Sequence, residues 1–204
     1  MAVPAEVLPK SSDFPSILEQ QYNSYLALED KTTAEAIAII KDGYKKSNQC
    51  FSAYKDNLEC RYFLGLFRGE MLALKQVSIK SELNLMVSDF ESVIQHQADY
   101  DRAGAHRALG HLYLELPSLP ILGFALKKDL PKAWEHVAQS LKSFPEDAEN
   151  LYLAGLIRIA EDDKVSAGLY FNKAADFMSD YTGPKAEKLR LRAAIQKGIK
   201  QAQK

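Results

Sequence analysis

Histidine and cysteine, the residues that most often do chemistry in proteins, are few in this chain and poorly spaced for a site. His106 and His111 are five residues apart, so they share a helix face poorly, and no His-x-x-x-His or Cys-x-x-Cys pair is present. His136 is expected on a helix surface, in contact with solvent. Glycine-rich phosphate loops are absent, and no isolated carboxylate pair lies among apolar residues. We therefore expect no catalytic residue, no metal site and no cofactor, and interpret the protein as a non-enzyme.

The two cysteines, Cys50 and Cys60, are too few for a disulfide framework. One bridge between them would form only in an oxidising compartment. Two separate thiols that pack between helices are the favoured interpretation.

Composition bounds the class of protein. Lys and Arg number 26 against 27 Asp and Glu, a balance that argues against a nucleic-acid binder. The basic tail, residues 185–204, is interpreted as a solvated terminal helix. No apolar run approaches the roughly 18 residues that a membrane span needs. The first residues lack a charged region followed by an apolar one, so we expect either a cytoplasmic protein or an exported one already trimmed.

Helical spacing of apolar residues runs through the chain, and prolines lie at the edges of the helical stretches. This pattern predicts helices over residues 13–28, 33–46, 56–75, 80–97, 102–115, 129–143, 146–160, 163–178 and 184–201.

A repeat connects these helices. Gly65, Gly110 and Gly155 are spaced by forty-five residues, and the third copy continues with Ala167, Phe171 and Ala174, the small–large–small spacing of a tetratricopeptide repeat. The predicted fold is all-α, a tetratricopeptide-like right-handed helical-hairpin array with insertions and a C-terminal capping helix. We expect one domain over 1–204: a flexible N-terminus (1–12), a degenerate first pair (13–50), three repeats (55–180) and the cap (184–204).

In such arrays the first helix of each pair lines a concave groove. Counting from the glycines predicts these groove residues: Tyr62, Leu66, Arg107, His111, Leu114, Tyr152, Leu156 and Ile159. An apolar loop follows the second of these helices, with Leu116, Pro117, Leu119, Pro120, Ile121, Leu122 and Phe124 as candidate site residues. Few polar groups among apolar walls are typical of a small-molecule pocket. Arg107 is the one cation among the predicted groove residues and would bind a small carboxylate amphiphile; alternatively, it pairs with Glu115 or Glu149 and the loop packs shut.

The most specific stretch of the sequence combines Asp99-Tyr100, Arg107 to Gly110, Pro117 to Gly123, Lys132 to His136 and Pro145 to Asn150. It resembles the periplasmic T-component proteins associated with TRAP transporters. That family usually has two adjacent glycines before its arginine helix, where this chain has Asp-Arg-Ala-Gly at 101–104. The resemblance implies an exported, periplasmic helical-repeat protein, with a lipid anchor in some members. It also implies docking on an extracytoplasmic solute-binding protein and formation of homo-oligomers.

The predicted function is a non-enzymatic helical-repeat scaffold for TRAP-type solute uptake, which binds a protein partner and a small apolar acid. The alternative function is a general tetratricopeptide adaptor for protein–protein interaction without a small-molecule ligand, and the alternative location is the cytoplasm. We expect no nucleic acid among its partners and no transmembrane segment.

Overall fold

The computed structural model describes residues 9–118 and 126–204, and every regular element in these ranges is helical. The predicted all-α class is therefore confirmed. The elements are α1 (Phe14–Leu26), α2 (Ala34–Ala53), α3 (Leu58–Ala73), α4 (Ile79–Gln97), α5 (Tyr100–Glu115), α6 (Leu130–Ser143), α7 (Ala148–Ala160), α8 (Lys164–Asp176), the 3-10 turn η1 (Phe177–Asp180) and α9 (Lys185–Ala202).

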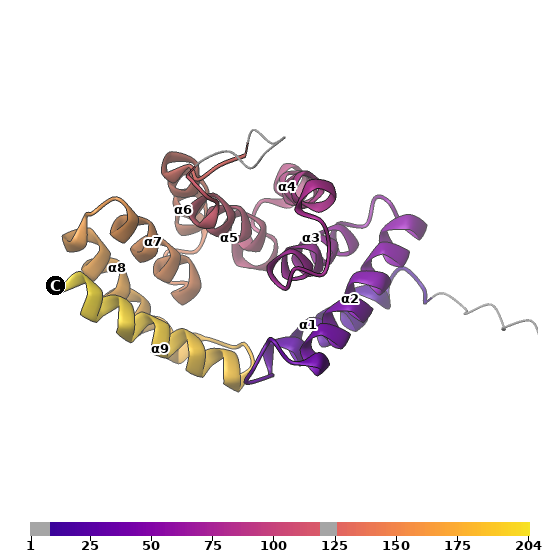
Figure 1. Ribbon diagram of the computed structural model, residues 1–204, viewed down its shortest axis with the longest axis horizontal. Coiled ribbons are helices and arrows are strands. Elements are labelled where there is room, and N and C mark those ends of the chain that lie inside the picture. Colours follow the sequence, from indigo (N-terminus) through magenta and orange to yellow (C-terminus); the bar gives the residue numbers. More distant parts are fainter. Residues whose placement is uncertain (1–8, 119–125) are drawn as a thin grey trace, which may run out of the picture.

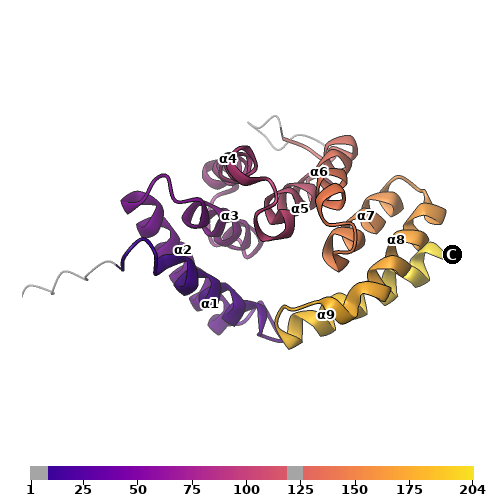
Figure 2. The ribbon, with the colours of Figure 1, turned by 180° about the vertical axis from the view of Figure 1, so that it is seen from behind.

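Successive helices pack as hairpins, α1 with α2, α3 with α4, α5 with α6 and α7 with α8. The odd-numbered helices form an inner row, in which α1 contacts α3, α5 contacts α7 and α7 contacts α9. Figures 1 and 2 show the array curving until its first and last helices, α1 and α9, meet on the side opposite α4 and α5. The chain is thus a helical-hairpin array whose two ends come together.

The three glycines spaced by forty-five residues lie where helices approach too closely for a side chain. A Cβ on Gly155 would come within 2.5 Å of the Phe171 ring, and one on Gly65 or Gly110 within 2.9 Å of a neighbouring side chain. Gly198 of α9 faces the same Phe171 ring, 2.7 Å from the position of its missing Cβ. The repeat spacing therefore marks contact points between helices.

The prediction of two free thiols is wrong. Cys50 and Cys60 form a disulfide between α2 and α3, with Cα atoms 5.6 Å apart and both residues fully buried. Helix α2 was expected to end at residue 46 but continues to Ala53, and this extension carries Cys50 to the first turn of α3. Ser47, a poor helix former, is fully buried and donates a hydrogen bond to the Tyr44 carbonyl. Tertiary packing overrides local helix propensity here.

Helix α5 opens with three residues in the left-handed region. Asp101, Arg102 and Ala103 have φ values of 47°, 52° and 63°. Non-glycine residues rarely adopt this conformation, at a cost on the order of 1–3 kcal/mol each. Such a turn suits glycine, so its occupants here must be held by other contacts.

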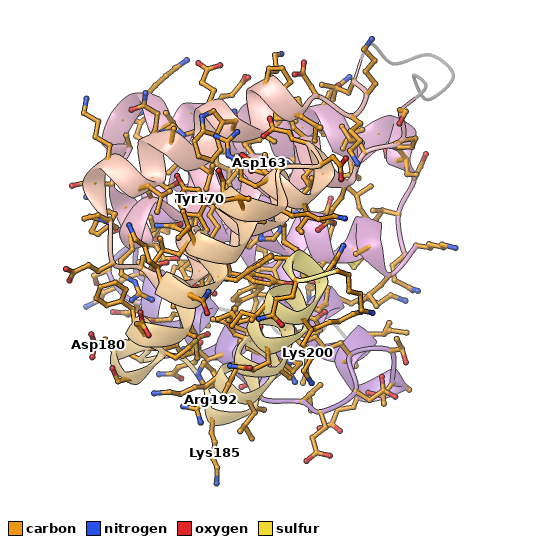
Figure 3. All side chains as sticks on the ribbon, turned by 90° about the vertical axis from the view of Figure 1, so that its left-hand side faces the viewer. Asp163, Tyr170, Asp180, Lys185, Arg192 and Lys200 are labelled. Atoms are coloured by element: carbon orange, nitrogen blue, oxygen red, sulfur yellow. A yellow bond between two sulfur atoms is a disulfide. The ribbon has the colours of Figure 1, made fainter. Side chains whose placement is uncertain are left out.

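The capping helix α9 packs against α8 and α7 and buries Leu191 and Ile195. Four of its basic side chains, Lys185, Arg192, Lys197 and Lys200, are exposed, and Figure 3 shows Lys185, Arg192 and Lys200 spread along the helix beside α8 with Asp163 and Tyr170. Lys188 and Arg190 are half-buried and donate hydrogen bonds to backbone carbonyls, so the helix is solvated on one side only. Within the described ranges, no helix has the length and apolar character to cross a membrane.

Candidate functional site

A partly open cavity of about 1070 Å³ lies on the inner side of the array. Its walls come from α1, α3, α4, α5, α7, α9 and residues 181–183. This volume is slightly above the roughly 300–1000 Å³ that is typical of pockets for small organic molecules. Aromatic side chains form much of the wall: Tyr22, Tyr62, Phe63, Phe90, Tyr100, Tyr152 and Tyr181.

The two ends of the chain close one side of this cavity. Lys31, which follows α1, pairs with Glu187 of α9 at 3.2 Å. Arg190 of α9 donates hydrogen bonds to the carbonyl oxygens of Leu28, at 2.5 Å, and of Leu26. These two carbonyls belong to the C-terminal end of α1 and its exit, where helical hydrogen bonds run out, so the arginine satisfies groups that the helix leaves free. The closure therefore depends on polar contacts between residues more than 150 positions apart.

The structure brings together five of the eight predicted groove residues. Tyr62, Leu66, Arg107, His111 and Tyr152 line the cavity, as do Leu116 and Pro117 at the start of the loop. The other predicted loop residues, Leu119, Pro120, Ile121, Leu122 and Phe124, lie outside the described ranges.

Three predicted groove residues are not in the wall. Leu114 points to the side of α5 and packs against the main core, because the lining face of this helix passes through His111 and Glu115. Leu156 and Ile159 share the face of Tyr152 but lie one and two turns further along α7, beyond the wall.

Arg107 is fully engaged by the protein. Its guanidinium lies 3.3 Å from Glu149 and 3.9 Å from Asp101, and it donates a 3.2 Å hydrogen bond to the Asn150 side chain. Burial lowers the pKa of this guanidinium, but the surrounding carboxylates outweigh burial and the net pKa is raised above the ordinary value. The alternative pairing with Glu149 is thus present. The guanidinium N–H groups are used by protein acceptors, so Arg107 has no free pair of donors for a ligand carboxylate.

The same network holds the left-handed turn. Arg107 donates to the Arg102 carbonyl at 3.3 Å, and Asn150 donates to that carbonyl at 3.4 Å. The Tyr62 hydroxyl donates to the Asp101 carboxylate, and Arg102 pairs with Asp147 at 3.2 Å. Side chains of α3, α5 and the start of α7 therefore stabilise a backbone conformation that is unfavourable for these non-glycine residues.

Glu70 is the carboxylate that the sequence analysis missed. It lies near the end of α3, lines the cavity, and accepts hydrogen bonds from Tyr22 at 3.2 Å and Tyr25 at 2.7 Å. Burial raises the pKa of Glu70 above its ordinary value, although the tyrosine hydrogen bonds and the nearby Lys31 lower it in part. No periodicity could have revealed it, because both tyrosines come from α1, 45 and 48 residues away.

His136 is half-buried instead of solvated. Its Nδ1 lies 3.0 Å from the Nδ1 of His106, and its ring stacks on Tyr113 with an interplanar angle of 4°. Burial, with the nearby His106 and Lys132, lowers the pKa of His136 to about 4. Over the ranges that the structure describes, no group of three or more His, Cys, Asp or Glu residues is arranged to hold a metal ion.

Comparison of the chain with protein-family models and with curated proteins finds no match.

Proposed function

We propose that this protein is a non-enzymatic helical-hairpin scaffold that holds a small organic ligand in its central cavity. The observation that carries this proposal is the partly open 1070 Å³ cavity with aromatic walls, to which both ends of the chain contribute. A largely apolar and aromatic wall with a few polar side chains is the usual make-up of a small-molecule site.

The closure by α1 and α9 favours a small ligand over a long peptide. An adaptor that binds an extended segment needs a groove that is open along the row of inner helices. Here the Lys31–Glu187 pair and the Arg190 hydrogen bonds bridge one side of the groove. A general tetratricopeptide adaptor is therefore the second candidate, and it requires this bridge to open.

We further propose that the protein works outside the cytoplasm in TRAP-type solute uptake. The Cys50–Cys60 disulfide supports the location, because structural disulfides persist in oxidising compartments. The transport role and the partner, an extracytoplasmic solute-binding protein, rest on the resemblance carried by residues 99–156. Homo-oligomers belong to the same proposal.

The test uses N-phenyl-1-naphthylamine, a neutral probe whose fluorescence rises in apolar sites. We expect saturable binding to the wild type and loss of binding in Leu66→Trp, because a larger ring at this wall position fills the cavity. Leu85→Trp is the matched control, since Leu85 is 49% exposed and lies outside the wall.

Equal binding by Leu66→Trp and the control would contradict the cavity as the site. Absence of saturable binding to the wild type, together with co-purification with a solute-binding protein, would favour the adaptor.

A further inference from the structure

The cations in the cavity wall are committed to the protein's own carboxylates. Arg107 pairs with Glu149, Arg102 with Asp147, and Lys31 with Glu187. An ion pair of this kind has little charge left for a ligand, since each partner screens the other. A ligand carboxylate would therefore have to displace an existing pair.

Glu70 differs from these carboxylates. Among the described residues, its hydrogen-bond donors are the Tyr22 and Tyr25 hydroxyls, one on each carboxylate oxygen. A hydroxyl satisfies one lone pair of an oxygen but does not neutralise the group, and each oxygen can accept a second hydrogen bond. The charge of Glu70 is thus held in position and remains open on the cavity side.

The surroundings of Glu70 suit an organic cation. Tyr22 contacts it from α1, and Leu66 and Tyr62 lie one and two turns before it on α3; all three line the cavity. Aromatic faces attract ammonium groups through their quadrupoles, most strongly where water is excluded. Apolar and aromatic walls around a carboxylate whose hydrogen-bond donors are uncharged hydroxyls favour a ligand with an apolar body and one ammonium group.

We propose that the cavity binds an apolar amine whose ammonium group donates hydrogen bonds to Glu70 while its ring system lies among the wall tyrosines. This inference rests on the proposed ligand-binding function and replaces the carboxylate amphiphile with a ligand of opposite charge. The remaining carboxylates in the wall disfavour an anionic head group in the same space; they are Glu19, Asp101, Glu115, Glu149 and Glu187.

Isothermal titration of the full chain with three matched probes tests the charge preference. Tryptamine carries an ammonium group at neutral pH, 3-ethylindole is neutral and indole-3-propionate is anionic. We expect tryptamine to bind at least tenfold more tightly than 3-ethylindole, and indole-3-propionate to bind most weakly. Tighter binding of the anion, or equal binding of all three, overturns the proposal. If 3-ethylindole alone binds, the amine proposal is wrong but the proposed ligand-binding function of the cavity is retained. If none of the three probes binds, both the amine proposal and the ligand-binding function are contradicted.

Glu70→Gln should weaken tryptamine binding at least tenfold and leave 3-ethylindole binding unchanged. Glu91→Gln is the control, because Glu91 is exposed on α4 and outside the wall. Unchanged tryptamine affinity in folded Glu70→Gln overturns the assignment.

A second variant keeps the test decisive if Glu70→Gln fails to fold, which circular dichroism would report. Lys31→Met removes the cation whose charge lowers the pKa of Glu70, but it also breaks the Lys31–Glu187 pair. Glu187→Gln breaks the same pair and keeps the cation, so Lys31→Met should bind tryptamine at least threefold more tightly than Glu187→Gln. Equal or weaker binding by Lys31→Met than by Glu187→Gln contradicts the proposal.

Discussion

The carboxylates on two sides of the cavity have different partners; one side is formed by α5 and α7 (the α5–α7 wall) and the other by α1 and α3 (the α1–α3 wall). On the α5–α7 wall, Glu149 and Asp101 surround the guanidinium of Arg107, and the charges cancel locally. On the α1–α3 wall, Glu70 is held by two tyrosine hydroxyls, which orient the carboxylate without cancelling its charge. The comparison shows that buried charge can serve structure on one wall and remain available for binding on the other.

The physical difference lies in what each wall loses when one partner is removed. Loss of Arg107 removes the partner of two carboxylates and of two hydrogen-bond acceptors at once, whereas loss of one tyrosine hydroxyl leaves Glu70 with its other donor. The α5–α7 wall should therefore be the more sensitive of the two.

The largest effect is expected on the α5–α7 wall from Arg107→Ala. This change leaves the carboxylates of Glu149 and Asp101 without their cation and removes two hydrogen bonds, one to the Arg102 carbonyl in the left-handed turn and one to the Asn150 side chain. We expect a loss of about 3–5 kcal/mol of unfolding free energy, measured by urea denaturation. Arg192→Ala, at an exposed position of α9, is the control and should change stability by less than about 0.5 kcal/mol. Similar stability of the two variants would remove the contrast between the walls.

The next effect concerns the support behind the α1–α3 wall, the Cys50–Cys60 disulfide. The bridge closes a short loop between α2 and α3 and limits the freedom of the unfolded chain. Reduction should lower the unfolding free energy by about 3 kcal/mol. Denaturation with and without a phosphine reductant measures this, and the double variant Cys50→Ala, Cys60→Ala should not respond to the reductant. Two free thiols in denatured, unreduced protein would contradict the bridge.

A smaller effect is expected from acid, behind the α5–α7 wall. The pKa of His136 is about 4 in the folded protein, below its ordinary value of 6.5. The unfolded state therefore binds a proton more readily, and stability that is present above pH 6.5 is lost as the pH falls towards 4. After allowance for partial solvent screening we expect a loss on the order of 1–2 kcal/mol between pH 7 and pH 5.

His136→Asn is the comparison for this pH effect, since its amide can still reach His106 but does not titrate. Thermal unfolding at several pH values should show a steeper decline for the wild type than for the variant. Parallel curves would mean that His136 does not contribute to the pH dependence of stability. Asp89, whose pKa burial raises to about 6, shifts both curves alike in the opposite direction.

The smallest effect is expected from Tyr25→Phe on the α1–α3 wall. The variant removes one hydroxyl from Glu70 and keeps the ring in the core. Because Tyr22 still donates to the carboxylate, the loss should be about 1 kcal/mol by urea denaturation. A loss as large as that of Arg107→Ala would show that the two walls are equivalent after all.

Local pattern was sufficient for most of the helices and for part of the cavity wall. The spacing of apolar residues placed α4 and α6 to within one residue at each end, because amphipathic period and proline boundaries are local properties. It also placed Tyr62, Leu66 and Arg107 on inner faces, since residues four apart share a helix face. The end of α2 was missed because burial of Ser47 and the Cys50 bridge outweigh the local preference to stop.

The sequence by itself thus determined the class of fold, the glycine contact points and the row of helices that faces inward. Only the tertiary structure decided which charges meet. The pairing of Lys31 with Glu187, and of Glu70 with Tyr22 and Tyr25, depends on the curvature accumulated over the whole array. A small change in each helix-crossing angle would separate α1 from α9. The summed effect of these angles over the array cannot be read from any local sequence pattern. The character of the cavity, with Arg107 paired to carboxylates on α5 and α7 and Glu70 held by tyrosine hydroxyls from α1, follows from the packing of the whole array.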